Sequence, residues 1–207
     1  MGFVGGHPNP LHAPRLGYSV APRWHLVTAS VPLGLARAVA DQQGWQLTAT
    51  RFYTGLPAPA DDQAWHDFWS AKLLAMSRTG VVTYSRPLRY RNKRVRLPDG
   101  TEHTYLHGEE KGIDVRIALD VIRLAHRHEY DVAVIFSQDQ DLSEVADEIR
   151  LIAREQQRFI KIASAFPVSP TSRNRRGINH TDWIRVDRAT YGACLDRRDY
   201  RDGSRAA

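Results

Sequence analysis

The stretch KGIDVRIALDVIRLAHRHEYDVAVIFSQDQDLSEVAD, from Lys111 to Asp147, decides the fold. Its first part predicts a helix from Lys111 to about His128, because apolar side chains recur there at three- and four-residue spacing. Asp131–Ser137 (DVAVIFS) is nearly continuously apolar, which is typical of a parallel strand covered on both faces. Leu142–Gln157 predicts a second helix with one apolar face.

The flanking sequence continues this alternation of helices and strands. Further helices are expected at Val31–Gln43 and from Asp61 or Asp62 to Arg78, and further strands at Trp45–Tyr53, Val81–Tyr84, Phe159–Ala165 and Trp183–Val186. A hairpin or long loop is expected over Arg89–Tyr105, turning at Pro98-Asp99-Gly100. The pattern indicates an α/β fold with an open, mainly parallel sheet. Right-handed crossovers would bring the carboxyl ends of its strands to one edge, where such sheets bind ligands.

The length of 207 residues suits one domain with short extensions. We expect an irregular, Pro- and Gly-rich segment over residues 1–30, the domain over 31–190 and a tail over 191–207. The longest apolar runs are too short to span a bilayer, and the first residues do not have the pattern of a secretory signal. The lone Cys194 fits a reducing cytoplasm.

The chain is basic, with a formal net charge of +6 and a pI near 9.7, which favours a nucleic-acid partner. Its cations gather in two clusters. The first holds Arg86, Arg89, Arg91, Lys93, Arg94 and Arg96, and the second holds Arg173, Arg175 and Arg176. Either cluster could be a solvated face. The functional interpretation is that both contact phosphates, since their sequence offers no fixed pattern for reading bases.

Three carboxylates stand at strand and helix ends of the quoted stretch. Asp114 lies in the first turn of a predicted helix, and Asp139 and Asp141 follow the central strand in a D-x-D spacing that points both side chains one way in extended chain. Hard oxygen ligands suit Mg²⁺ or Mn²⁺, which can activate water at a phosphodiester. Such a metal site in a basic protein indicates nucleic-acid cleavage.

Each acid also has a structural interpretation. Asp141 could cap the helix that follows it, Asp139 could be a turn residue, and Asp114 could be favoured by the helix dipole. Asp182 could approach the same sheet edge just before the last strand. Asp120 faces another way and suits a structural role, while Glu109 and Glu110 are expected in a solvated loop.

The segments KGIDVRIALDVIRLA and YDVAVIFSQDQDL resemble the NYN branch of the PIN-like nucleases. Those proteins carry a lysine-glycine-x-aspartate helix start and a strand ending in a serine-x-aspartate-x-aspartate loop. The resemblance is specific over residues 111–150 and looser from Trp45 to Asp187. It implies a Rossmann-like (PIN-like) three-layer fold, Mg²⁺ or Mn²⁺ as cofactor, RNA as partner and endoribonuclease (hydrolase) chemistry.

The same resemblance implies roles for single residues. It assigns metal binding and catalysis to Asp114, Asp139 and Asp141, and it fits Asp182 to a less constant late acid of the family. Ser137 would be a loop-shaping hydroxyl, and Lys111 would contact a phosphate or a metal ligand.

The amino terminus departs from this pattern. The family opens with a strand ending in aspartate-glycine-x-asparagine, whereas this chain reads FVGGHPN from Phe3 to Asn9 and places Gly5 at the aspartate position. Gly5 has no side chain to bind metal. Two explanations remain open: a weakened or inactive relative that still binds RNA, or a garbled reading of residues 5–30, for instance by a frame slip.

Other catalytic signatures are missing from the sequence. It contains no phosphate-binding P-loop, no G-x-G-x-x-G after a strand, no Cys/His pairs at zinc spacing and no G-x-S-x-G elbow. The leading hypothesis is a metal-dependent ribonuclease. An RNA-binding module with a decayed site comes second, and a nucleotide-sugar transferase with a D-x-D metal site third. The sequence leaves a homodimer open.

Overall fold

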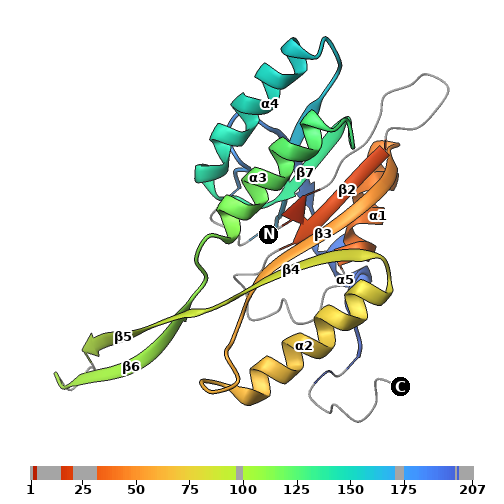
Figure 1. The fold of residues 1–207 in the computed structure, drawn as a ribbon. Helices are drawn as coiled ribbons and strands as arrows, with labels where there is room; N and C mark the ends of the chain where they lie inside the picture. The colour runs from red at the N-terminus through yellow and green to blue at the C-terminus, as the bar shows by residue number, and fades with distance from the viewer. Residues whose placement is uncertain are drawn as a thin grey trace.

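The computed structural model describes residues 32–96, 100–170, 175–198 and 200, and the backbone of residues 2–3 and 15–20. The strands are β1 Gly2–Phe3, β2 Arg15–Val20, β3 Gln46–Leu56, β4 Val81–Pro87, β5 Arg89–Arg96, β6 Glu102–Glu109, β7 Val132–Phe136, β8 Lys161–Pro167 and β9 Asp182–Val186. The helices are α1 Pro32–Gln43, α2 Gln63–Arg78, α3 Ile113–His126, α4 Ser143–Glu155 and α5 Arg188–Ala193, with a 3-10 turn at Gln140–Leu142 (Figure 1).

The main sheet is largely parallel, with strand order β4-β3-β2-β7-β8-β9 and the short β1 pairing antiparallel to β3. The parallel strands thus appear in the chain order third, second, first, fourth, fifth and sixth, which is the order of a Rossmann-like sheet. The order reverses between β2 and β7. The carboxyl ends of these two strands therefore flank the point where such sheets bind ligands.

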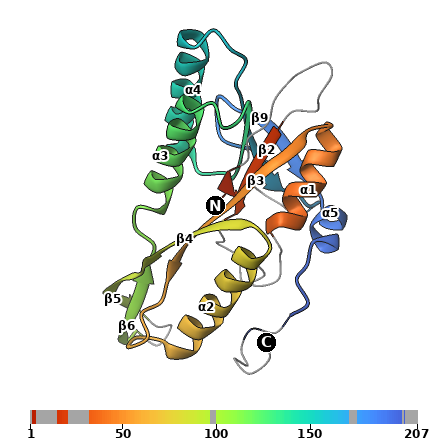
Figure 2. The ribbon, with the colours of Figure 1, turned by 45° about the vertical axis from the view of Figure 1, so that its right-hand side comes forward.

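Helices cover both faces of the sheet, which gives a three-layer α/β fold (Figure 2). On one face α3 and α4 pack against Tyr53, Ala133 and Ile135. On the other face α1 packs against Val132 and Val134, and α2 lies beside it. The side chains of β7 alternate between the two layers because successive residues of a strand point to opposite faces. The fold class predicted from the sequence is confirmed. In the described part of the chain, no helix has the length and apolarity to cross a membrane.

The amino-terminal strands differ from the expectation. β2 pairs with both β3 and β7 at the centre of the sheet, so residues 15–20 are not irregular. Gly2–Phe3 is the first strand of the chain, but it runs antiparallel to β3 and does not open the parallel part of the sheet. Pro14 and Pro22 flank β2 and hid it in the sequence. Gly5, His7 and Asn9 lie outside the described residues.

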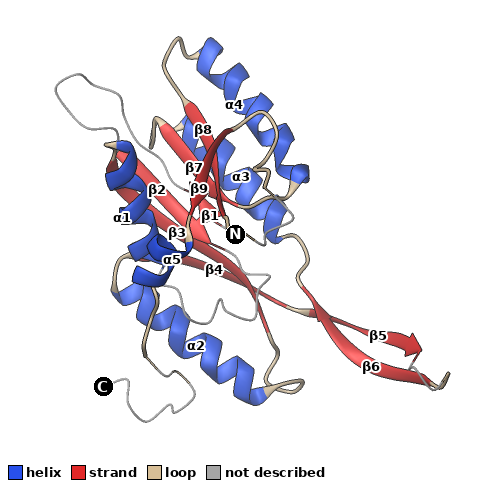
Figure 3. Ribbon diagram, turned by 180° about the vertical axis from the view of Figure 1, so that it is seen from behind, coloured by secondary structure: helices blue, strands red, loops and turns tan. Residues whose placement is uncertain are grey.

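β5 and β6 form a hairpin that projects from the body of the domain (Figure 3). Pairing is continuous from Arg89 with Glu109 to Arg96 with Glu102, which confirms the expected hairpin. Its expected turn residues Pro98 and Asp99 are outside the described part of the chain. All residues of the first basic cluster except Arg86 therefore lie on this hairpin, outside the three-layer core.

The chain after β9 packs back onto the domain. α5 lies against α1, and the ring of Tyr200 meets Phe68 of α2 edge-on at 5.9 Å between centroids. The carboxylate of Asp196 accepts a hydrogen bond from the Tyr200 hydroxyl at 2.6 Å and pairs with Arg198 at 2.9 Å. The segment expected to be a tail is thus part of the fold as far as residue 200.

This docking buries Lys72 of α2, which is 1% exposed. Its ammonium lies 5.7 Å from the ring centroid of Tyr200 and 5.8 Å from that of Trp69. Burial lowers the pKa of Lys72 from 10.5 to about 8, and the carboxylate of Asp196 partly opposes this effect. The folded chain therefore binds this proton less tightly than the unfolded chain does.

The free energy of unfolding should consequently rise with pH above about 8, where folded Lys72 is neutral and the unfolded side chain still binds a proton. We expect a gain of about 1–2 kcal/mol between pH 7.5 and 9.5, with the shifted pKa as its source. Urea unfolding of the starting chain and of Lys72→Met across this range would test it. The variant should lose the rise. An equal rise in both proteins would show that Lys72 titrates normally.

Candidate metal site

The loop after β7 is built around Ser137 and Asp139. β7 is buried along its whole length, so its carboxyl end is fixed in the core. The backbone N–H of Asp139 donates to the Ser137 hydroxyl at 3.0 Å. The Asp139 carboxylate then accepts the N–H of Asp141 at 3.1 Å and caps the 3-10 turn Gln140–Leu142. Ser137 thus shapes the loop that presents Asp139.

The D-x-D segment is not extended, which corrects the expected geometry. Asp139 itself is in the extended region, but Asp141 lies inside the 3-10 turn and is exposed. Asp141 also does not cap α4, whose amino-terminal cap is Leu142, without a side-chain hydrogen bond. Asp139 does take the turn role that its residue type favours. A carboxylate has two oxygens, so this cap still leaves Asp139 able to bind a second partner.

Asp114 enters the same edge from α3. Gly112 starts this helix with a φ of 72°, in the left-handed region that glycine adopts readily. Asp114 follows in the first turn, and its Oδ1 atom is buried without a hydrogen-bond partner among the described residues. Burial raises the pKa of Asp114, and the carboxylates of Asp139 and Glu110 raise it further. The fold therefore places these like charges close enough to repel one another.

Glu110 is a member of this edge that the sequence did not single out. Its carboxylate accepts hydrogen bonds from the backbone N–H of Gly55 and, at 3.3 Å, from the hydroxyl of Thr54 at the end of β3. Glu110 does lie in an exposed loop, as expected, whereas Glu109 is half-buried at the end of β6. Glu109 pairs instead with Lys93 at 3.0 Å and Lys111 at 3.4 Å at the base of the hairpin. No local pattern could have separated the two glutamates, because their partners lie on other elements.

Asp182 lies elsewhere. It begins β9, paired in register with Ala163 of β8, and its carboxylate meets the ammonium of Lys161 at 2.7 Å. Lys161 is the first residue of β8, so this ion pair belongs to the amino ends of the parallel strands. The expectation that Asp182 approaches Asp139 is corrected: a residue that starts a parallel strand lies away from the edge where the strands end.

Basic residues approach the candidate edge from two directions. Arg86, near the end of β4, donates to the carbonyl of Gly112 at 3.4 Å beside the start of α3. From the other direction, Gln138 donates to the carbonyl of Arg176 at 2.8 Å. Arg175 adjoins it in the sequence, and Arg173 lies outside the described residues. Arg86 of the first cluster and the backbone of Arg176 in the second thus lie near the edge that carries Asp114 and Asp139.

Two amide side chains hold the backbone from Arg176 to Asn179 in place. Besides the bond from Gln138, the Gln140 side chain donates to the carbonyl of Gly177 at 3.0 Å and accepts the N–H of Asn179 at 3.0 Å. A Cβ atom at Gly177 would lie 2.3 Å from the Ser164 hydroxyl, so this close packing needs glycine. The role of Gln138 and Gln140 could not be predicted, since their partners are almost forty residues away in the chain.

The donor set fits a hydrated hard cation. Mg²⁺ typically binds through one or two carboxylates and keeps several waters. Asp114 and Asp139 could supply those carboxylates, and the unpartnered Oδ1 of Asp114 is an oxygen that a cation would satisfy. Three or more His, Cys, Asp or Glu side chains at metal-binding spacing do not occur within the described ranges. The first central strand adds no carboxylate, because Ala21-Pro22 follows β2 in the sequence.

The chain matches one protein family. The family model described as "NYN domain" matches residues 31–166, which is more than half of the chain. No curated protein and no solved structure matches it.

Proposed function

Because this chain belongs to the NYN domain family, whose members have PIN-like, RNA-related functions, we propose that it is a divalent-metal-dependent endoribonuclease. The observation that carries the proposal is a carboxylate oxygen of Asp114 that is buried without a hydrogen-bond partner among the described residues, beside Asp139 at the carboxyl edge of a Rossmann-like sheet. The proposed cofactor is Mg²⁺ or Mn²⁺ and the proposed substrate is RNA. The single cysteine supports a cytoplasmic location.

In this proposal Asp114 and Asp139 hold the cation, and the exposed Asp141 binds one of its waters. The bound ion would activate a water for in-line attack on a phosphodiester and offset charge on the leaving oxygen. Ser137 keeps Asp139 in position through the loop hydrogen bond. Lys111 and Arg86, at the base of the hairpin, hold the RNA backbone near the scissile phosphate.

A labelled RNA assay tests the proposal directly. Purified protein would be incubated with single-stranded and structured RNA in Mg²⁺, Mn²⁺ or EDTA. Internal cleavage that requires the metal supports an endoribonuclease. Binding without cleavage supports the second candidate, an RNA-binding protein with a weakened site. The observation that favours this candidate is that β2 is followed by Ala21, without a carboxylate.

The site should gain a metal ligand when a carboxylate follows β2. Val20 and Phe136, the last residues of β2 and β7, pair in register, and these two strand ends flank the point where the strand order reverses. Ala21→Asp should therefore tighten Mn²⁺ binding by about tenfold and accelerate cleavage. Gly5→Asp is the matched control, because Gly5 precedes β2, the first parallel strand of the sheet, and so does not follow its carboxyl end. Titration calorimetry with Mn²⁺ would compare the variants. Tighter Mn²⁺ binding by Gly5→Asp alone would show that Gly5, and not Ala21, stands at the position of the family's first aspartate.

The hairpin is proposed to bind phosphates. On β5 the side chains of Arg91 and Lys93 lie on the same strand face as Tyr105 and His107 of β6. Replacing Arg89, Arg91 and Arg94 with alanine should weaken binding to RNA of any sequence. The slope of log affinity against log salt should fall by about 0.7 for each lost contact. Fluorescence anisotropy at several salt concentrations would measure both.

The control removes the same amount of charge by replacing three exposed arginines that lie on helices, Arg37, Arg78 and Arg154, with alanine. If both triple variants show the same slope, the hairpin is a solvated arm and no phosphate-binding surface.

A further inference from the structure

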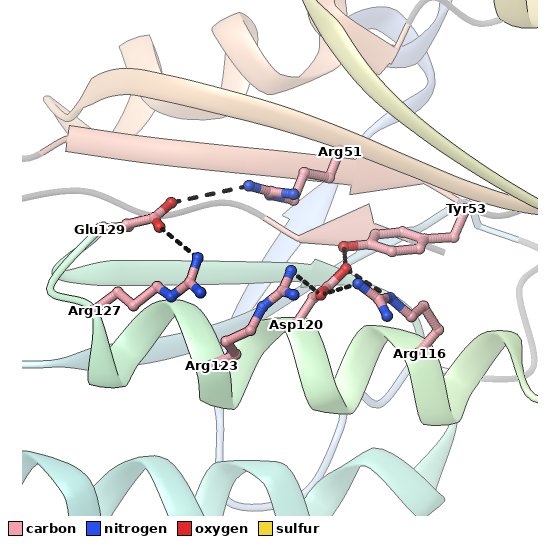
Figure 4. Close-up of polar contacts among 7 residues, drawn as sticks. All are labelled: Arg51, Tyr53, Arg116, Asp120, Arg123, Arg127 and Glu129. Carbon is pink, nitrogen blue, oxygen red and sulfur yellow. Dashed lines mark hydrogen bonds and ion pairs between the residues drawn. The ribbon is translucent and has the colours of Figure 1, made fainter.

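One buried carboxylate on α3 holds two arginines side by side. Asp120 accepts two hydrogen bonds from Arg116, at 2.7 and 3.1 Å, and one from Arg123, at 2.7 Å (Figure 4). The Nη2 atoms of both arginines bind the same oxygen, Oδ1 of Asp120. The two guanidinium groups therefore converge on one point of the surface.

The arginine pair is built into the fold. The side chain of Asp120 is 4% exposed, and the hydroxyl of Tyr53 donates to its second oxygen at 2.9 Å. Arg116 binds Asp120 through two N–H groups, which fixes its plane, and its guanidinium carbon lies 5.0 Å from the ring centroid of Tyr84. The side chains of Arg116 and Arg123 thus lose conformational entropy on folding, before any ligand binds.

The cluster nevertheless remains cationic and open to solvent. Two guanidinium groups share one carboxylate, so the group keeps a net positive charge. The side chains of Arg116 and Arg123 are 31% and 46% exposed, whereas Asp120 lies beneath them against Tyr53. Each guanidinium has five N–H groups, and Asp120 takes only one from Arg123.

The cluster lies on the helix that also carries Asp114, and it faces β4. Arg116 follows Asp114 in the first turns of α3, and the ring of Tyr84 beneath it belongs to β4. This side of β4 is open, since Val82 is 48% exposed and Arg86 is exposed as well. Arg86 reaches Gly112 at the start of α3. A chain of cationic groups therefore runs from the metal-site edge along the open side of β4.

We propose that Arg116 and Arg123, held together by Asp120, clamp one phosphate of the RNA strand on the β4 side of the scissile bond. The inference rests on the proposed function and deepens it by giving the strand a direction of exit from the site. Paired guanidinium groups match phosphate oxygens in both charge and planar geometry. A phosphate of an RNA backbone is favoured over a free phosphate ion because the neighbouring Arg86 offers the backbone a second contact.

The test measures RNA binding in EDTA, where a metal-dependent cleavage cannot interfere. The probe is a short fluorescein-labelled oligouridylate titrated at several salt concentrations. Arg116→Gln with Arg123→Gln should lower the salt slope by about 0.7 and weaken binding at 0.1 M salt by about fivefold, as expected for one lost phosphate contact. Arg123→Gln alone, which leaves the two-point pair of Arg116 with Asp120 intact, should show part of this loss and guards against misfolding of the double variant.

The matched control is Arg78→Gln with Arg154→Gln, which removes the same charge from α2 and α4. If the double variant and the control bind with equal affinity and slope, the clamp does not exist. The starting chain is assayed separately for cleavage with Mn²⁺. Cleavage together with unchanged binding of the double variant overturns the clamp alone. Lost binding in the double variant without any cleavage by the starting chain supports the clamp and overturns the nuclease.

Discussion

Replacing Asp139 or Asp114 with asparagine should reduce the proposed metal-dependent RNA cleavage by about 10²–10³-fold, because either change would remove a charged group from the proposed cation site. Binding of RNA in EDTA should change little, since the arginines that hold the backbone remain. Single-turnover cleavage at saturating Mn²⁺ would measure the loss. Thermal unfolding with and without Mn²⁺ would show whether the metal still stabilises the folded chain.

The Asp114 variant should not lose stability in EDTA. The raised pKa of Asp114 means that its charged form is disfavoured in the folded chain, so at pH 7 the charge costs stability. Asp114→Asn removes that cost and should unfold at the same temperature or higher. The control is Asp182→Asn, a carboxylate paired with Lys161 away from the site, which should keep full activity. Full activity in Asp139→Asn would refute the metal site.

Replacing Arg158 with alanine should lower the free energy of unfolding by about 3–4 kcal/mol, as expected when one partner of a buried, hydrogen-bonded ion pair is removed. Arg158 follows α4 and is 15% exposed. It donates to the carbonyls of Ala125 and Tyr130 at 2.8 Å and to the carboxylate of Asp131 at 2.9 Å. One side chain therefore joins the end of α3 to the start of β7.

Urea unfolding followed by circular dichroism would measure this loss. Arg154→Ala is the matched control, because Arg154 is exposed in the last turn of the preceding helix, α4, and should change stability by less than about 0.5 kcal/mol. Arg158→Lys should recover only part of the loss, since an ammonium cannot bind both carbonyls and the carboxylate in the planar geometry of a guanidinium. A loss below about 1 kcal/mol for Arg158→Ala would show that solvent replaces its contacts.

The parts of the fold that the sequence predicted are those with local periodicity. α3, β7 and α4 were expected nearly within their observed limits, because apolar spacing of 3.6 residues or a continuous apolar run reports directly on burial. β2 was missed because prolines flank it and Gly17 interrupts it. α5 was missed because six residues are too few to establish a helical period.

The candidate site also contains residues that local sequence patterns could predict and residues that they could not. Asp114 and Asp139 could be predicted because each follows a recognisable element boundary. Glu110 and Gln140 could not, because their contacts depend on where β3 and residues 177–179 lie in space. Asp182 was placed wrongly because it precedes its strand, and a residue that starts a strand of a parallel sheet lies at the edge opposite the carboxyl ends. Sequence patterns report local geometry, and the meeting of distant loops depends on the strand order.

The projecting hairpin also makes the length of the proposed RNA-binding arm independent of the rest of the domain. Arg89 and Glu109 already form a register pair at its base, next to the end of β4 and the start of α3. Residue pairs further out on the hairpin can be added or removed without moving either neighbour. An isolated two-stranded ribbon is only marginally stable, so the outer pairs contribute little to folding. Reach along an RNA can therefore evolve, or be engineered, as a parameter separate from catalysis.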